Sequence, residues 1–168
     1  MDQQKSRRVQ ILQRQTIFQQ FIFRIEELEL QHETFAGSMS EPLKRLVLDR
    51  GDAAAVLLHD PVANKILLCE QFRAATLNHG TGWLDELPAG MVDEDETAEA
   101  CARRETQEET GQVADVLKHI TTVYPSPGGS SERIHLFYSS VSLKGEVSEL
   151  GGLASEGEDI RTVILPGD

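Results

Sequence analysis

The stretch RRETQEETG, residues 103–111, places Glu105, Glu108 and Glu109 within five positions. In a helix, steps of three and four residues bring all three side chains to one face. Like charges stacked in this way repel, by about 0.2–0.5 kcal/mol for each exposed pair and by more where the pair is partly buried. A cation bound between the carboxylates would remove this repulsion.

The segment before these glutamates predicts a helix over roughly residues 97–110. Asp95 or Thr97 is suited to cap its start, and Gly111 stands where a helix C′ glycine belongs. The side of the helix that carries the glutamates is small and apolar in its first half, at Ala98, Cys101 and Ala102. We therefore expect the first half of this helix face to pack on the core and the second half, with the glutamates, to lie in a cleft.

Three converging carboxylates form the hard oxygen ligand set that Mg²⁺ or Mn²⁺ prefers. The alternative is a solvated acidic helix face, which is the commoner meaning of a charge run. Composition alone favours the solvated face. The residues around the helix are needed to distinguish it from a metal site.

The rest of the chain predicts a mixed-sheet α/β core with one inserted helix and a small antiparallel β segment at the front. We expect an N-terminal β segment over 1–49 and a main domain over 50–168. DAAAVLLHD and KILLCEQF, on either side of the turn signal DPVAN, predict a hairpin, and WLDELPAG predicts a strand that enters a tight loop at residues 88–90. Further strands are expected in RVQILQRQ, FIFRIEELEL, LKRLVLDR, VADVLKHITTVY, RIHLFYSSVSL and DIRTVILP.

Composition excludes several classes of protein. The 168 residues carry a net charge of −12, which argues against a protein that holds nucleic acid by its phosphates. The polar start has no apolar signal core, and no stretch approaches a membrane span. Cys69 and Cys101 have no metal-ligand spacing and predict small core residues in a reducing compartment. We expect a cytoplasmic protein with no nucleic-acid or membrane partner.

The run GMVDEDETAEACARRETQEETG, residues 90–111, resembles the Nudix box. A glycine is followed by five residues, a glutamate, seven residues and then Arg-Glu-x-x-Glu-Glu-x-Gly. Thr106 and Gln112 depart from the aliphatic residues usual at their places, which bears on local packing more than on chemistry. The matching residues are Gly90, Glu96, Arg104, Glu105, Glu108, Glu109 and Gly111.

This resemblance implies a Nudix-type core whose catalytic loop–helix–loop holds divalent metal against a diphosphate. Two or more Mg²⁺ ions are implied, with Mn²⁺ as a possible substitute. Glu105 and Glu109 would be the principal ligands, and Arg104 would pair with Glu96 or a neighbour and orient the helix as part of the catalytic set. The implied metal ligands are Ala89, through its carbonyl, and Glu105, Glu108, Glu109 and Glu158.

Three further stretches, EQFRAAT, YPSPGGSSER and GGLASEGEDIR, are similar to the ADP-ribose pyrophosphatase branch of that family from about residue 43 onwards. That likeness implies hydrolysis of ADP-ribose to AMP and ribose 5-phosphate by a homodimer. Phe21 would stack on adenine, although a strand core position is the alternative for this residue. The other implied substrate contacts are Arg45, Arg50, Arg73, Met91, Ser126, Pro127, Gly128 and Glu132.

Glu156 is the residue that the resemblance implies as general base. Gly151, Gly152 and Gly157 surround it, which predicts a loose backbone and a mobile loop that closes over substrate.

Two other functions stay open from the sequence. Close relatives with QFR and SPGG loops suggest the same chemistry on another nucleotide sugar, such as GDP-mannose. A non-catalytic Nudix-like binding module is a weaker alternative, because such modules typically lose the box glutamates. A structural calcium protein would need an Asp-x-Asp-x-Asp-Gly loop, which the sequence lacks.

Overall fold

The structure is a computed structural model that describes residues 7–143, 150–153 and 157–168. By its internal packing the chain forms two compact units, each described below by itself. The first contains the residues up to Gly51 together with Tyr124–Glu132, and the second contains Asp52–Val123 and Arg133–Asp168. In the described ranges, no helix has the length and apolar character needed to cross a bilayer.

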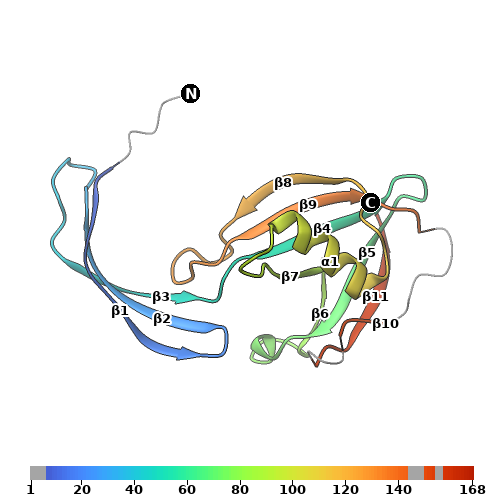
Figure 1. The fold of residues 1–168 in the computed structure, drawn as a ribbon, viewed down its shortest axis with the longest axis horizontal. Coiled ribbons are helices and arrows are strands. Elements are labelled where there is room, and N and C mark those ends of the chain that lie inside the picture. The colour runs from blue at the N-terminus through green and yellow to red at the C-terminus, as the bar shows by residue number, and fades with distance from the viewer. Residues whose placement is uncertain (1–6, 144–149, 154–156) are drawn as a thin grey trace. The chain divides into compact units, whose positions relative to one another are not determined.

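The first unit is built on a three-stranded antiparallel sheet (Figure 1). Its strands, in the order β1-β2-β3, are β1 (Val9–Gln20), β2 (Phe23–His32) and β3 (Leu43–Asp49). A tight turn joins β1 to β2, and Leu48 at the end of β3 makes an isolated parallel bridge to Ser130. Every residue of β1 is exposed, so this sheet buries little apolar surface of its own.

The second unit is built on a mixed sheet, as the sequence predicts, and this sheet has eight strands among the described residues. Its main path has the order β10-β11-β5-β4-β9-β8, with β6 paired to β5 and β7 paired to β4. The β4–β9 pair is parallel, and the β4–β5 pair is the predicted hairpin. The strands are β4 (Ala53–Asp60), β5 (Lys65–Phe72), β6 (Trp83–Glu86), β7 (Ala89–Met91), β8 (Leu117–Val123), β9 (Ile134–Ser140), β10 (Leu150–Gly151) and β11 (Ile160–Pro166).

The helix α1 (Ala98–Thr110) confirms the sequence prediction in its position and at both ends. Of the two candidate caps, Thr97 is the one used, since its hydroxyl accepts a hydrogen bond from the Ala100 amide at 3.1 Å. The helix ends at Gly111, which adopts the left-handed backbone conformation. The predicted small apolar face is buried, because Cys101 and Ala102 join the core cluster of Ala54, Val56, Leu58, Leu67, Phe137 and Val141.

Three predictions about local structure are wrong. The tight loop expected at residues 88–90 is instead the entrance to β7, which pairs with Ala53–Ala55 of β4. The glycine-rich stretch after residue 150, expected to be a loop, begins with the short strand β10. The strand expected from residue 113 starts at Leu117. In the first two cases, pairing with another strand supplies order that the local sequence pattern does not show.

Candidate active site

The site is built on the face of α1 that packs next to β7. Glu105 and Glu109 point to this side and are buried, with 8% and 3% of their surface exposed. The Ala89 amide of β7 donates a hydrogen bond to Glu109 Oε2 at 3.0 Å. A Cβ atom on residue 90 would stand 1.7 Å from Glu105 Oε1, so a larger residue here would force the Glu105 carboxylate out of its place.

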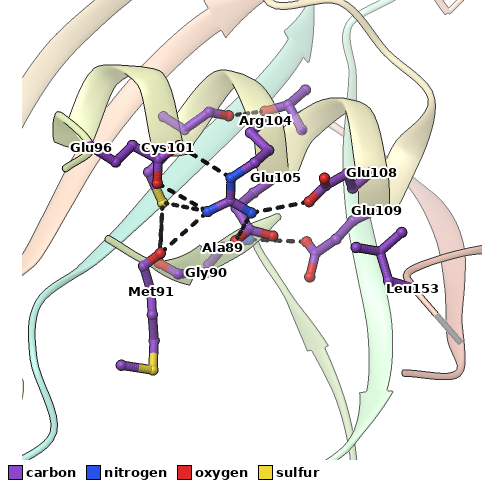
Figure 2. Close-up of polar contacts among 12 residues, drawn as sticks. Ala89, Gly90, Met91, Glu96, Cys101, Arg104, Glu105, Glu108, Glu109 and Leu153 are labelled. Carbon is purple, nitrogen blue, oxygen red and sulfur yellow. Dashed lines mark hydrogen bonds and ion pairs between the residues drawn. The ribbon is translucent and has the colours of Figure 1, made fainter. Parts of the chain in front are cut away.

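Arg104 lies in the middle of the acidic residues (Figure 2). Its guanidinium donates to Glu96 Oε1 and Oε2 at 3.1 and 3.0 Å, which confirms the expected pairing with Glu96. It also donates to Glu105 Oε1 at 2.8 Å and to Glu108 Oε2 at 3.0 Å. The same arginine therefore connects the box loop with two of the helix carboxylates, which the sequence did not predict.

Burial dominates the electrostatics of the two inner carboxylates. It raises the pKa of Glu109 to about 8, with a further contribution from the negative charges of Glu105 and Glu158, although the Ala89 amide acts in the opposite direction. Burial also raises the pKa of Glu105, whereas the hydrogen bond from Arg104 and its positive charge lower that pKa. The ionised form of this pair is therefore costly unless a further cation approaches.

The donor set suits a hard divalent cation. Glu105, Glu108, Glu109 and Glu158 supply carboxylate oxygens, and Glu158 is near enough for its charge to act on both buried glutamates. As oriented in the described part of the chain, no three Asp, Glu, His or Cys side chains gather around one point where an ion could be shared. The reason is local, since Arg104 engages Glu105 and Glu108 while Ala89 engages Glu109. Metal binding would require these carboxylates to change partners.

Two buried thiols lie beneath the site, and both are free cysteines, as expected for core residues. Cys101 donates to the Met91 carbonyl at 3.2 Å, and Cys69 hydrogen-bonds the Glu109 side chain. Burial raises the pKa of the Cys101 thiol to about 12 and that of Cys69 further. Both thiols therefore stay protonated and act as hydrogen-bond donors. No sequence signal linked Cys69 to Glu109.

Two of the predicted substrate contacts belong to this unit. Met91 ends β7, and its carbonyl lies 3.4 Å from the Arg104 guanidinium. Arg73 follows β5 and donates to Glu86 Oε2 of β6 at 2.8 Å. Sequence reasoning did not single out Glu86, because the pairing of β5 with β6 brings it to Arg73.

The remaining predicted substrate contacts lie in the first unit. Within it the structure brings together Arg50 and Glu132, with 3.7 Å between Nε and Oε1. Arg45 is exposed on β3 and donates to the Lys44 carbonyl at 2.8 Å. The exposed residues Ser126, Pro127 and Gly128 begin a turn in which the Ser126 carbonyl accepts from the Ser130 amide at 2.9 Å.

Phe21 occupies the turn between β1 and β2, with a positive φ of 52° and 89% of its surface exposed. The alternative that it is a strand core residue is therefore wrong. Within residues 7–51 and 124–132, its ring stays exposed.

Glu156 lies outside the described residues, but Glu158 is inside them. The Glu158 carboxylate accepts a hydrogen bond from the Leu153 amide at 2.9 Å. The expectation of a loose backbone at Gly151 and Gly152 is wrong, because both glycines pack closely against neighbouring atoms. A Cβ atom on residue 157, by contrast, would meet nothing within 4 Å.

The raised pKa of Glu109 predicts a pH-dependent stability of the metal-free protein. Below the ordinary pKa of 4.5 both folded and unfolded states are protonated, whereas between 4.5 and about 8 only the unfolded state loses its proton. Stability is therefore lost as pH rises through this window. In EDTA, Glu109→Gln should raise the urea midpoint at pH 8 and leave it nearly unchanged at pH 4.5. The exposed control Glu94→Gln should show no such difference, and an equal gain at both pH values would contradict the burial argument.

Comparison with known proteins agrees with this geometry. The NUDIX domain family model matches residues 49–164. The ADP-ribose pyrophosphatase of Haemophilus influenzae is 38% identical over 161 residues, which covers 94% of this chain and 73% of that protein. The protein of the same name from Escherichia coli K12 is 38% identical over 158 residues, covering 94% of this chain and 75% of the relative.

Two further likenesses concern a shorter sequence match and a solved structure. The GDP-mannose pyrophosphatase of Cronobacter sakazakii is 41% identical over 125 residues, covering 73% of this chain and 64% of that protein. A solved structure described as an ADP compounds hydrolase has the same fold, with a TM-score of 0.65 at 19% identity, covering 95% of this chain and 78% of that chain. The family model and the two relatives that match nearly the whole chain, together with the carboxylate face of α1 against β7, show that this chain belongs to the Nudix family.

Proposed function

We propose that this protein hydrolyses the diphosphate of ADP-ribose, adding one water across the P–O–P linkage to give AMP and ribose 5-phosphate. The observation that carries the proposal is the burial of Glu105 and Glu109 on one face of α1, with the charge of Glu158 acting on both, inside a Nudix fold. A non-catalytic module would have little use for buried carboxylates that raise the free energy of its own folded state.

The extent of the sequence matches supports ADP-ribose as the substrate. The relatives named ADP-ribose pyrophosphatase match 94% of this chain, including most of the N-terminal sheet, whereas those named GDP-mannose pyrophosphatase match 73%. GDP-mannose stays the second candidate, because identity within that shorter match is 41%.

The proposed cofactor is Mg²⁺, with Mn²⁺ as a substitute and two or more ions in the site. Its ligands would be the carboxylates of Glu105, Glu108, Glu109 and Glu158 and the carbonyl of Ala89. When bound, divalent cations neutralise phosphoryl oxygens and lower the pKa of a water molecule. Arg104 would keep the helix oriented through Glu96, a contact that needs neither of the principal ligands.

The proposed substrate contacts divide between the two units. Arg73 and Met91 of the second unit would face the phosphates and the terminal ribose. In the first unit, Arg45 and Arg50 would bind phosphate or ribose, Ser126, Pro127, Gly128 and Glu132 would line the terminal ribose, and Phe21 would stack on adenine. An exposed aromatic ring in a tight turn is available for such stacking.

We also propose a homodimer in the cytoplasm. The free thiols of Cys69 and Cys101 suit a reducing compartment. The N-terminal sheet exposes many large apolar side chains, which a second copy would cover. They include Val9, Ile11, Leu12, Ile17, Phe18, Ile22 and Phe23.

A panel of nucleotide sugars tests the activity. With Mg²⁺ present, ADP-ribose should be hydrolysed with a higher kcat/KM than GDP-mannose, with AMP and ribose 5-phosphate separated by chromatography. EDTA should abolish turnover, and Glu105→Gln should lower kcat by about 100-fold or more. Glu99→Gln, on the opposite face of α1, is the matched control and should keep its activity. Turnover of Glu105→Gln at the wild-type rate would exclude Glu105 as a ligand.

Substitutions of Glu156 and Glu158 should have different effects on the kinetics of hydrolysis. Glu156→Gln removes the proposed proton acceptor and should depress kcat about 100-fold or more, with KM and the melting temperature nearly unchanged. Glu158→Gln should instead raise the metal concentration needed for half-maximal rate. If Glu156→Gln keeps most of its kcat at saturating metal, the base lies elsewhere, with Glu132 or a glutamate of the Nudix box the next candidate.

Light scattering tests the assembly. We expect a mass of twice the chain in solution, because apolar strand surface of this kind is unfavourable in water. Replacing Ile11 and Phe18 by serine should shift the mass towards the monomer, while the exposed polar control Gln15→Ser should not. A fully active wild-type monomer would contradict the proposal.

A further inference from the structure

The strand β10 makes an unusually close approach to the end of α1. A Cβ atom on residue 151 would stand 1.8 Å from the Glu109 carbonyl oxygen and 2.5 Å from its carbonyl carbon. These are backbone atoms, which cannot turn aside as a flexible side chain can. Glycine is therefore required at position 151 for β10 to reach the helix.

The next residue, Gly152, caps the C-terminal end of α1. The Gly152 amide donates to the Glu108 carbonyl at 3.0 Å, and the Gly111 amide donates to the Gln107 carbonyl at 2.9 Å. The last carbonyl groups of a helix have no partner within the helix, so the segment that follows β10 supplies one of these caps from a distant part of the chain. Gly152 has a positive φ of 84°, which favours glycine at this position.

Gly152 and the next residue, Leu153, also contact Glu158. Its side chain accepts from the Leu153 amide at 2.9 Å, and its own amide donates to the Leu153 carbonyl at 3.3 Å. A Cβ atom on residue 152 would come within 2.9 Å of Glu158 Cβ. Residues 151–153 thus contact the backbone of Glu108 and Glu109 on one side and Glu158 on the other.

We propose that Gly151, Gly152 and Leu153 form a rigid joint that sets Glu158 against Glu109, so that the two carboxylates act on one divalent cation. The glycines are positioning residues, and their role is close packing rather than freedom of the backbone. The inference deepens the proposed function and depends on its metal site.

The experiment measures Mn²⁺ binding, by the rise in melting temperature and by electron paramagnetic resonance of free Mn²⁺, so that it does not depend on turnover. Gly151→Ala should raise the half-saturating Mn²⁺ concentration by about 10-fold, as expected when the support of a metal ligand is disturbed. The matched control is Gly80→Ala, whose new Cβ would meet only the Thr76 carbonyl at an ordinary 3.8 Å. It should bind Mn²⁺ as wild type does.

A double-mutant cycle separates positioning from general damage. If Gly151 acts through Glu158, Gly151→Ala should change the half-saturating concentration less than about twofold when Glu158→Gln is already present. Equal effects in both backgrounds would overturn the inference. A wild-type protein with no response to Mn²⁺ would instead overturn the metal site itself, whereas equal responses of wild type and Gly151→Ala would overturn the joint alone.

Hydrogen exchange on the wild-type protein gives a second test that needs no variant to fold. In EDTA, the amides of Gly152 and Leu153 should exchange slowly, because both are hydrogen-bonded before any metal binds. Exchange at the rate of a free peptide at both amides would show that the joint is not preformed and would refute the proposal.

Discussion

The burial of two like-charged carboxylates, Glu105 and Glu109, on one face of α1 is the constraint around which the second unit is arranged. Removing such groups from water costs several kcal/mol each unless partners compensate. The Arg104 guanidinium and the Ala89 amide supply part of that compensation. The cost that remains is reflected in the raised pKa of Glu109. Binding of a cation would lower the free energy of such a site, because it would compensate the buried negative charge.

Small side chains allow the helix to lie where its carboxylates meet the strand. Cys101 and Ala102 pack on the core without holding α1 away from β7, and Gly90 leaves room for the Glu105 carboxylate. The hydrogen bond from the Cys101 thiol to the Met91 carbonyl ties the first half of the helix to the end of that strand. The position of the carboxylates therefore depends more on the close approach of α1 to β7 than on the conformations of the glutamate side chains.

The two ends of α1 are held by different means. Thr97 caps the first turn locally, as the sequence predicts. At the last turn, Gly152 supplies a partner to the Glu108 carbonyl from a segment far along the chain. Because Glu108 and Glu109 lie in this last turn, the part of the helix that carries the proposed metal ligands is also the part that depends on tertiary contacts.

The helix, its caps, the Nudix box and most strands could be predicted from the sequence, because each depends on residues a few positions apart. The common face of Glu105, Glu108 and Glu109 could be predicted for the same reason, since helical spacing alone brings these side chains together. Other features depended on the tertiary structure. They include the strand at Ala89–Met91, the contact of Cys69 with Glu109 and the grouping of residues 124–132 with the N-terminal sheet. A glycine in the sequence is compatible both with a flexible loop and with a point of close packing. Only the atoms that surround it in the folded structure distinguish the two. At Gly151 these atoms are the backbone of Glu109, which lies next to it because β10 pairs with β11 and packs against the end of α1.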